Sequence, residues 1–123
     1  MTPTQRTLRA LRDAGRICAI VEKWNAHARI RQDMFGIIDI IALDPVFGVV
    51  GVQSCGQAFA EHHRKLTEEK VQECLDWLGT PGTALELWGW RKVKVKRGGK
   101  AGIWEPRVKV YTLDDFADDP LAD

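Results

Sequence analysis

The sequence has few of the features that mark membrane, secreted or repeat proteins. Its 123 residues contain no apolar run long enough to cross a bilayer, and the N-terminus is polar and carries arginines, unlike a signal peptide. The three cysteines, Cys18, Cys55 and Cys74, are scattered and form no C-x-x-C pair, so nothing indicates a disulfide framework or a structural zinc site. We therefore expect a reduced, cytoplasmic protein with no membrane contact.

Internal repeats and low-complexity segments are also missing, except for a short acidic stretch at the C-terminus. A chain of this length with 45% hydrophobic residues can build one core. The sequence predicts a single domain over residues 1–113 and an acidic tail over residues 114–123.

Charge is distributed unevenly between these two parts. The formal net charge is +1, but the first 113 residues contain all 18 basic and only 12 of the 17 acidic residues, which gives them a net charge of +6. A positive body favours binding to a polyanion such as nucleic acid. The alternative is a mildly basic domain followed by a solvated tail.

The hydrophobic pattern predicts an α/β fold. It indicates a helix at 4–14, strands at 16–24, 36–43 and 49–54, helical pieces at 57–66 and 67–78, and strands at 84–90 and 103–111. Residues 25–35 are predicted to be a loop or a frayed strand extension. This αβββαβ order predicts a mixed central sheet flanked by helices, because a helix between the third and fourth strands permits the fourth to pair in parallel with an earlier strand.

Asp39 and Gln53 are the polar residues that most need an explanation. Each lies in an apolar run that is typical of a buried strand, and a carboxylate between isoleucines is costly to bury without compensation. The short connection at residues 43–48 predicts that the two strands are antiparallel neighbours. If their register is favourable, Asp39 and Gln53 share one spot on one sheet face, which indicates a cation site.

These same segments carry a family resemblance. Residues 35–42 (FGIIDIIA) and 49–55 (VVGVQSC) resemble the PD-(D/E)XK nuclease superfamily, and most of all its small Holliday-junction-resolvase-like and phage or bacterial branches. The resemblance extends from residue 5 to residue 93. It implies a nuclease that hydrolyses phosphodiester bonds and uses Mg²⁺, with Mn²⁺ as a substitute.

The resemblance also implies roles for individual residues. Asp39 and Gln53 would hold the metal together with a backbone carbonyl of Ser54 or Cys55, and Glu22 would complete the site. The superfamily pattern has an acidic residue where this chain has Gln53, and a lysine where it has Cys55. Lys65 on the following helix is the expected replacement for that catalytic lysine, and the loss of one negative charge favours a single metal.

Three further residues are weaker candidates. Asp33 is expected to be exposed in a loop or paired with Arg31. His62 and His63 are adjacent on a predicted helix, where side chains point about 100° apart, so they cannot readily share one metal. We expect one of the two to face the sheet and the other to face solvent.

A basic hairpin over residues 88–111 is the clearest candidate for phosphate binding. The predicted DNA contacts are Arg64, Arg91, Lys92, Lys94, Lys96, Arg97 and Lys100. Lysine on an edge strand also deters aggregation, which is an alternative explanation for the same pattern. The nearby tryptophans are expected to be core residues rather than stacking platforms.

Together these features predict a metal-dependent endonuclease acting on DNA, with branched or structured DNA as the substrate that the resemblance implies. A homodimer is expected by the same analogy. The alternative is a nuclease-fold domain that has lost catalysis and binds nucleic acid or a partner protein. Gln53 and Cys55 are the residues that favour this alternative.

Overall fold

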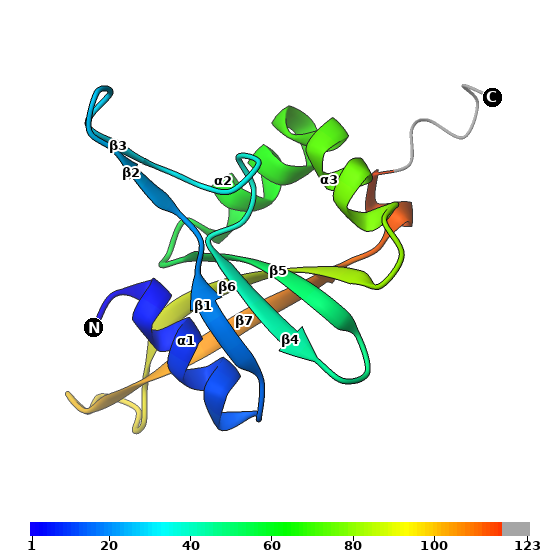
Figure 1. The fold of residues 1–123 in the computed structure, drawn as a ribbon. Coiled ribbons are helices and arrows are strands. Elements are labelled where there is room, and N and C mark those ends of the chain that lie inside the picture. Colours follow the sequence, from blue (N-terminus) through cyan, green and yellow to red (C-terminus); the bar gives the residue numbers. More distant parts are fainter. Residues whose placement is uncertain (117–123) are drawn as a thin grey trace, which may run out of the picture.

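The computed structural model describes residues 1–116 and has an α/β fold built on a mixed five-stranded sheet (Figure 1). The strands of this sheet run in the order β1-β4-β5-β6-β7, and helices cover both of its faces. The elements along the chain are α1 (Pro3–Asp13), β1 (Ile17–Ile20), β2 (Lys23–Asn25), β3 (Ile30–Gln32), β4 (Ile40–Asp44), β5 (Gly48–Cys55), α2 (Phe59–Arg64), the π-helical turn η1 (Lys65–Glu69), α3 (Val71–Leu78), β6 (Thr83–Lys94), β7 (Gly102–Tyr111) and the 3₁₀ turn η2 (Leu113–Phe116).

Helix α1 covers one face of the sheet, and its start is set by local sequence. Thr2 and Gln5 form a reciprocal capping box, and Pro3 occupies the first turn, where its missing N–H costs no hydrogen bond. Leu8 and Leu11 are buried against residues of β4 and β5, in agreement with the predicted amphipathic helix.

The helical layer α2–η1–α3 covers the opposite face and connects β5 to β6. These two strands pair in parallel, as the crossover predicts, with Gln53 opposite Leu87. The indole Nε1 of Trp77 in α3 donates to the carbonyl of Ala84 at 2.7 Å, which ties the layer to the sheet. The αβββαβ order expected from the sequence is therefore present.

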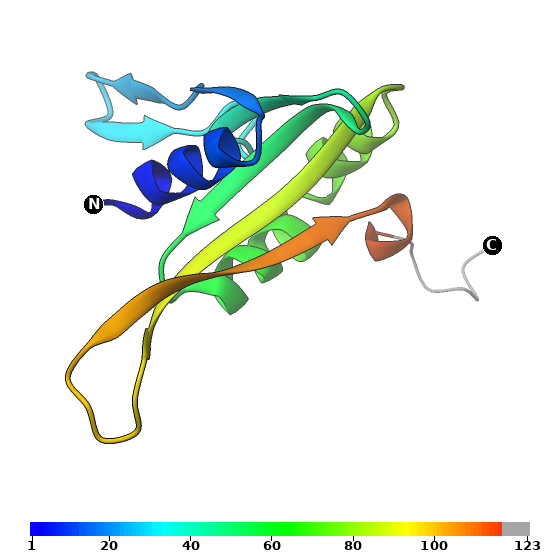
Figure 2. The same ribbon diagram turned by 90° about the horizontal axis from the view of Figure 1, so that it is seen from below.

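Strands β6 and β7 continue together beyond the rest of the sheet as a long hairpin arm (Figure 2). The first half of β6 is buried in the core, and its last residues are mostly exposed. The arm is therefore a direct extension of a core strand.

The described C-terminal segment packs on the body of the protein. Phe116 is buried beside Tyr111, and Asp115 forms an ion pair of 3.1 Å with Lys109. The predicted tail over 114–123 is thus part of the domain at residues 114–116, and the remainder of that tail, residues 117–123, lies outside the described residues.

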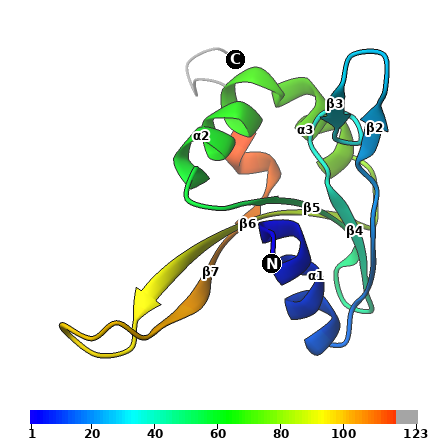
Figure 3. The same cartoon turned by 90° about the vertical axis from the view of Figure 1, so that its left-hand side faces the viewer.

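Two predicted strands differ from the structure. The segment 16–24 divides into β1 and β2, and residues 25–35 contain β3, which pairs with β2 as a separate two-stranded sheet (Figure 3). The segment predicted as a strand from Gly36 begins pairing in β4 only at Ile40, because residues 34–38 form a turn closed by a bridge between Met34 and Ile38. Phe35 and Gly36 both have positive φ in this turn, a conformation that no strand allows.

No helix within residues 1–116 is long and apolar enough to cross a membrane.

Candidate metal centre

The ends of several strands lie side by side at one end of the main sheet. Glu22 follows the end of β1, Asp39 immediately precedes the start of β4, and Gln53 lies near the end of β5. Because β4 is antiparallel to both β1 and β5, these three positions lie at the same end of the sheet. The arm formed by β6 and β7 extends from this end of the sheet as well.

Three carboxylates are brought together there: Glu22, Asp33 and Asp39. Each offers one oxygen, and these oxygens lie within 4.8 Å of one another. An open pocket of about 480 Å³, lined in part by Glu22 and Asp33, leads to the cluster. Asp33 lies in a loop, as expected, but it is neither exposed nor paired with Arg31, since Asp33 contacts Lys65 and Gln53 and Arg31 contacts Glu22.

The backbone of Asp39 fixes the position of its neighbours. Its N–H donates to the carbonyl of Val52 at 2.8 Å, and its own carbonyl accepts from the N–H groups of Val21 at 2.8 Å and Glu22 at 3.3 Å. The backbone of one residue, Asp39, therefore connects β5 to the segment that carries Glu22.

The side chain of Asp39 is held from the other side by Ser54. The Ser54 N–H donates to Asp39 Oδ2 at 2.9 Å, and the Ser54 hydroxyl lies 3.5 Å from the same oxygen. Ser54 thus donates to a carboxylate through its N–H, and the role of the Ser54 or Cys55 carbonyl as a metal ligand stays a prediction.

Gln53 supports the cluster in a way the sequence did not predict. Its side chain is fully buried, and Nε2 donates to the Ile37 carbonyl at 2.8 Å and to Asp33 Oδ2 at 3.1 Å. Its Oε1 lies 2.9 Å from His62 Nδ1. The Ile37 carbonyl can only accept, so the amide nitrogen must face it and the amide oxygen must face His62. The expectation that Gln53 supplies an oxygen ligand is therefore not met.

His62 completes this supporting chain. Because Oε1 of Gln53 is an acceptor, His62 donates from Nδ1. Burial and the nearby Lys65 lower the pKa of His62, so the ring is neutral near pH 7. Neither histidine simply points into solvent, since the His63 ring bonds to the Tyr111 hydroxyl at 2.7 Å.

Lys65 lies where the sequence placed it, beside the carboxylates. Its Nζ donates to Asp33 Oδ2 at 3.2 Å, and its side chain is partly exposed. Lys65 begins the π-helical turn η1, a type of distortion that recurs at functional sites. Cys55 is buried, and burial together with Asp39 raises the pKa of its thiol to about 11, so it is a neutral thiol near pH 7. A thiol carries no positive charge in either protonation state, so Cys55 cannot replace the catalytic lysine.

The two aspartates do not ionise equally. Burial, followed by the hydrogen bond to Asp33, raises the pKa of Asp39 to about 8. Burial also opposes the ionisation of Asp33, but its hydrogen bond to Asp39 and the charge of Lys65 outweigh this effect and lower its pKa below the ordinary value of 3.8. Near pH 7 without a cation, Asp33 is ionised and Asp39 holds a proton, which is the behaviour of carboxylates forced into one site.

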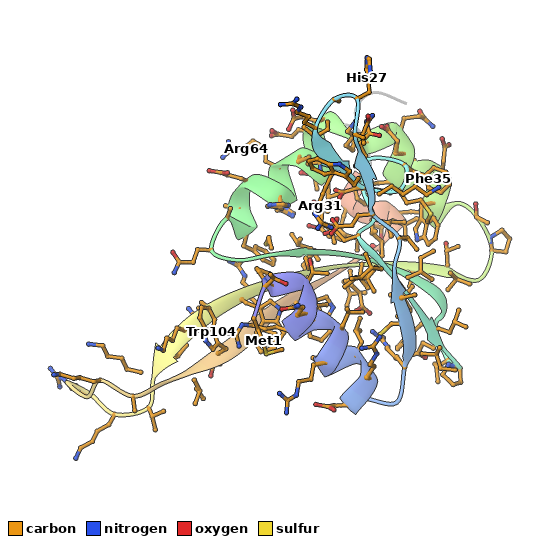
Figure 4. The ribbon with its side chains drawn as sticks, turned by 60° about the vertical axis from the view of Figure 1, so that its left-hand side comes forward. Met1, His27, Arg31, Phe35, Arg64 and Trp104 are labelled. Carbon is orange, nitrogen blue, oxygen red and sulfur yellow. The ribbon has the colours of Figure 1, made fainter. Side chains whose placement is uncertain are left out.

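Arg31 lies beside this centre, whereas most of the predicted phosphate-binding residues lie along the arm that extends away from it (Figure 4). Arg31 Nη1 donates to Glu22 Oε1 at 3.2 Å, and Arg64 points outward from α2. The predicted contacts on the arm are all exposed: Arg91, Lys92, Lys94, Lys96, Arg97 and Lys100. Trp104 on the arm is partly exposed and lies beneath the guanidinium of Arg6 at 4.1 Å, so it is not a core residue.

Comparisons of this chain with protein families, with curated proteins and with solved structures give no match. The chemistry of the centre is therefore interpreted from its own residues and their geometry.

Proposed function

We propose that this protein is a metal-dependent nuclease that hydrolyses phosphodiester bonds in DNA, of the PD-(D/E)XK type that its sequence resembles. The observation that carries the proposal is the convergence of Glu22, Asp33 and Asp39 within 4.8 Å, with Lys65 bonded to Asp33 at 3.2 Å. A centre of several carboxylates and one lysine, reached from an open pocket, is the equipment that phosphodiester hydrolysis requires.

The donor set suits Mg²⁺ or Mn²⁺. Both are hard cations that prefer oxygen ligands, and Mg²⁺ keeps several waters, so two or three protein oxygens suffice. Glu22, Asp33 and Asp39 would hold the ion, with Asp39 giving up its proton on binding. A bound divalent ion would lower the pKa of a water and balance negative charge on the phosphate.

The surrounding residues have supporting roles in this proposal. Lys65 places a positive charge beside the carboxylates, where it would stabilise charge that develops on a phosphate oxygen. Gln53 and His62 hold Asp33 and the Ile37 backbone in place without contacting the substrate. In this proposal Lys65 supplies the positive charge, and Gln53 positions the carboxylates without binding the metal. The site would therefore need no charged residue at Gln53 or Cys55, where the superfamily pattern has one.

Binding of DNA would depend on the basic surface. The first 113 residues carry a net charge of +6, and the cations of the arm are exposed at the end of the sheet that bears the acidic centre. Exposed lysines and arginines contact phosphates without reading sequence, which supplies affinity that decreases with salt.

Cleavage of DNA tests this function directly. Branched, duplex and single-stranded DNA would be incubated with the protein and Mg²⁺ or Mn²⁺, with chelated samples as blanks. We expect metal-dependent cutting that Asp39→Asn abolishes and that Asp76→Asn, which alters an exposed carboxylate on α3, leaves unchanged. Cutting that survives Asp39→Asn would show that the activity belongs elsewhere.

A second function is favoured by one observation, the two ion pairs within the centre. Arg31 pairs with Glu22 and Lys65 pairs with Asp33, so the carboxylates are partly neutralised by the protein itself. This balance is compatible with a DNA-binding domain that has lost catalysis. Binding to DNA without cutting, unaffected by Asp39→Asn, would identify that function.

A further inference from the structure

The hairpin formed by β2 and β3 is set apart from the main sheet. Its strands pair with each other, Lys23 with Gln32, Trp24 with Arg31 and Asn25 with Ile30, and within residues 1–116 neither strand joins the five-stranded sheet. Figure 3 shows it projecting above the sheet, beside the helical layer. A two-stranded hairpin buries little apolar surface and adds little to the stability of the fold. Its exposed side chains are therefore the part of the hairpin that needs an explanation.

That surface combines an exposed indole with positive charge. Trp24 is 60% exposed, which is unusual for a tryptophan in a small protein with a well-packed core. Its cross-strand partner is Arg31, so the indole and the guanidinium share one face of the hairpin. The segment 23–32 contains three cations, Lys23, Arg29 and Arg31, and no acidic residue.

The hairpin is also joined directly to the acidic centre. Glu22 immediately precedes β2 and Asp33 immediately follows β3, so two of the three carboxylates are the end residues of this one unit. Arg31 bonds to Glu22 from within the hairpin. A ligand held by the hairpin is consequently held next to the carboxylates.

We propose that the β2–β3 hairpin binds an unpaired nucleotide, whose base stacks on Trp24 while Arg31, on the same face, contacts the adjacent phosphate. Aromatic side chains accept any unpaired base by stacking, and cations beside them track the backbone. A paired base inside a duplex cannot present its face to the indole. The proposal rests on the proposed function for its catalytic consequence, which is that the preferred substrate has single-stranded character beside the cut.

Binding without catalysis tests the hairpin by itself. A labelled oligothymidine and a blunt duplex of equal length would be titrated with protein in chelator, and their fluorescence anisotropy measured. We expect Trp24→Ala to weaken binding of the oligothymidine about tenfold, which corresponds to the loss of one stacked base, and to weaken duplex binding less than twofold. Trp24→Phe should retain most of the affinity, because the ring still stacks.

A matched control lies at another exposed aromatic residue. Phe47 is 59% exposed in the turn between β4 and β5, at the opposite end of the molecule from the hairpin (Figure 1), so Phe47→Ala should change neither affinity. Equal loss of both affinities in Trp24→Ala, or no loss, would overturn the proposal. So would a change from dimer to monomer in sedimentation, since the indole would then be a contact between copies of this chain.

The catalytic readout separates this proposal from the proposed function. With Mg²⁺ present, Trp24→Ala should slow cutting of a forked DNA about tenfold relative to cutting of a blunt duplex. If no DNA is cut under any condition but the selective loss of oligothymidine binding is observed, the nuclease assignment fails and the hairpin's role stands. If Asp39→Asn abolishes cutting but Trp24→Ala affects both DNA forms alike, the nuclease assignment stands and the hairpin's role fails.

Discussion

Two clusters of charged residues lie at opposite ends of β4, and they are built differently. Asp44, at the end of the strand, belongs to a cluster with Arg16 and Glu86, whereas Asp39, just before its start, belongs to the acidic centre. In both clusters the acidic side chains outnumber the basic ones. The difference lies in how each carboxylate is satisfied.

In the Arg16 cluster every carboxylate contacts a cation. The guanidinium donates to both oxygens of Glu86, at 3.0 and 3.1 Å, and to Asp44 at 2.9 Å. The indole of Trp88 donates to Glu86 as well, at 2.9 Å. The bond to Glu86, which outweighs the effect of burial, raises the pKa of Arg16, and backbone bonds from Phe47 together with Arg16 lower the pKa of Asp44.

In the acidic centre, no cation within residues 1–116 contacts Asp39. It is hydrogen-bonded to another carboxylate and to Ser54, and the cations nearby, Lys65 and Arg31, bond to Asp33 and Glu22 instead. The first cluster therefore stabilises the fold as it is, while the second leaves one carboxylate without a cation among the described residues, as the proposed metal site requires. The comparison separates a structural ion network from a candidate site on one sheet.

Removal of Arg16 should have the largest effect on stability. Arg16→Ala would leave Glu86 buried without its cation, and breaking a buried pair in this way costs about 3–5 kcal/mol of the free energy of unfolding. Urea denaturation measures this loss. Arg9→Ala, which removes an exposed cation of α1, is the control and should change stability by less than about 0.5 kcal/mol.

Substitution of Asp39 should lower activity without lowering stability. Asp39→Asn removes a candidate metal ligand, and we expect cleavage to fall by about a hundredfold or more. Because Asp39 holds a proton near pH 7, the neutral amide replaces a neutral carboxyl, so the free energy of unfolding should stay unchanged at pH 7 and increase only at pH values above 8, where the parent aspartate is ionised beside Asp33. Asp44→Asn should instead lower stability, and loss of stability in both variants would remove the distinction between the two clusters.

The stability of the parent protein should decrease as pH rises from about 4 to about 8. The pKa of Asp39 is about 8 in the folded state, above its ordinary 3.8, so the folded state binds the extra proton in this range. That stabilisation is complete below the ordinary pKa and is lost as pH rises through 8. The lowered pKa of Asp33 has its effect only near or below 3.8.

Thermal unfolding at a series of pH values checks this dependence. Asp39→Asn should make the melting temperature nearly independent of pH over this range. The other titratable groups around Asp39, which are Glu22, Lys65 and His62, are still present in that variant, so the change can be assigned to Asp39. Mg²⁺ should raise the melting temperature of the parent more at pH 9 than at pH 6, because the ion and the proton compete for Asp39. An equal effect of Mg²⁺ at both pH values would argue against Asp39 as a ligand.

Neutralising the tip of the arm should have the smallest effect. Lys96→Gln combined with Arg97→Gln should weaken DNA binding about tenfold at moderate salt and reduce the slope of log affinity against log salt by about two. The matched control is Arg9→Gln with Arg12→Gln, which removes the same charge from exposed positions on α1. A similar loss in the control would mean that total charge, and not the arm, determines binding.

The order of the elements was predictable because it depends on hydrophobic periodicity. Helix α1, strand β5 and the parallel pairing of β6 with β5 all follow from patterns within single segments. Lys65 was located beside the centre for a similar reason, since the helix after β5 must return over the sheet.

The hairpin and Asp33 were missed because their structure depends on local turn chemistry. Asn25 accepts from the N–H groups of His27 and Ala28, and Arg29 adopts a positive φ, which together reverse the chain. A signal was present in the sequence, since Asn25 follows Trp24 at the point where a turn residue would close a hairpin. Once the hairpin forms, Glu22 and Asp33 must lie side by side.

The role of Gln53 could not be read from the sequence for another reason. Its position on the sheet face was predicted, but an amide presents either a donor or an acceptor, and the choice depends on the Ile37 carbonyl in a turn whose shape was not foreseen.

If the protein cleaves DNA as proposed, the unbroken course of β6 determines the length of duplex that it contacts. Leu87 lies opposite Gln53 at the centre, and Lys94 is seven residues further along the same strand. At about 3.3 Å per residue this spans about 23 Å, which matches about seven base pairs of duplex at about 3.4 Å each. Because the arm is a direct continuation of a core strand, its length along the proposed duplex is set by the strand, and DNA that ends nearer the scissile bond would leave the cations at the tip without a phosphate.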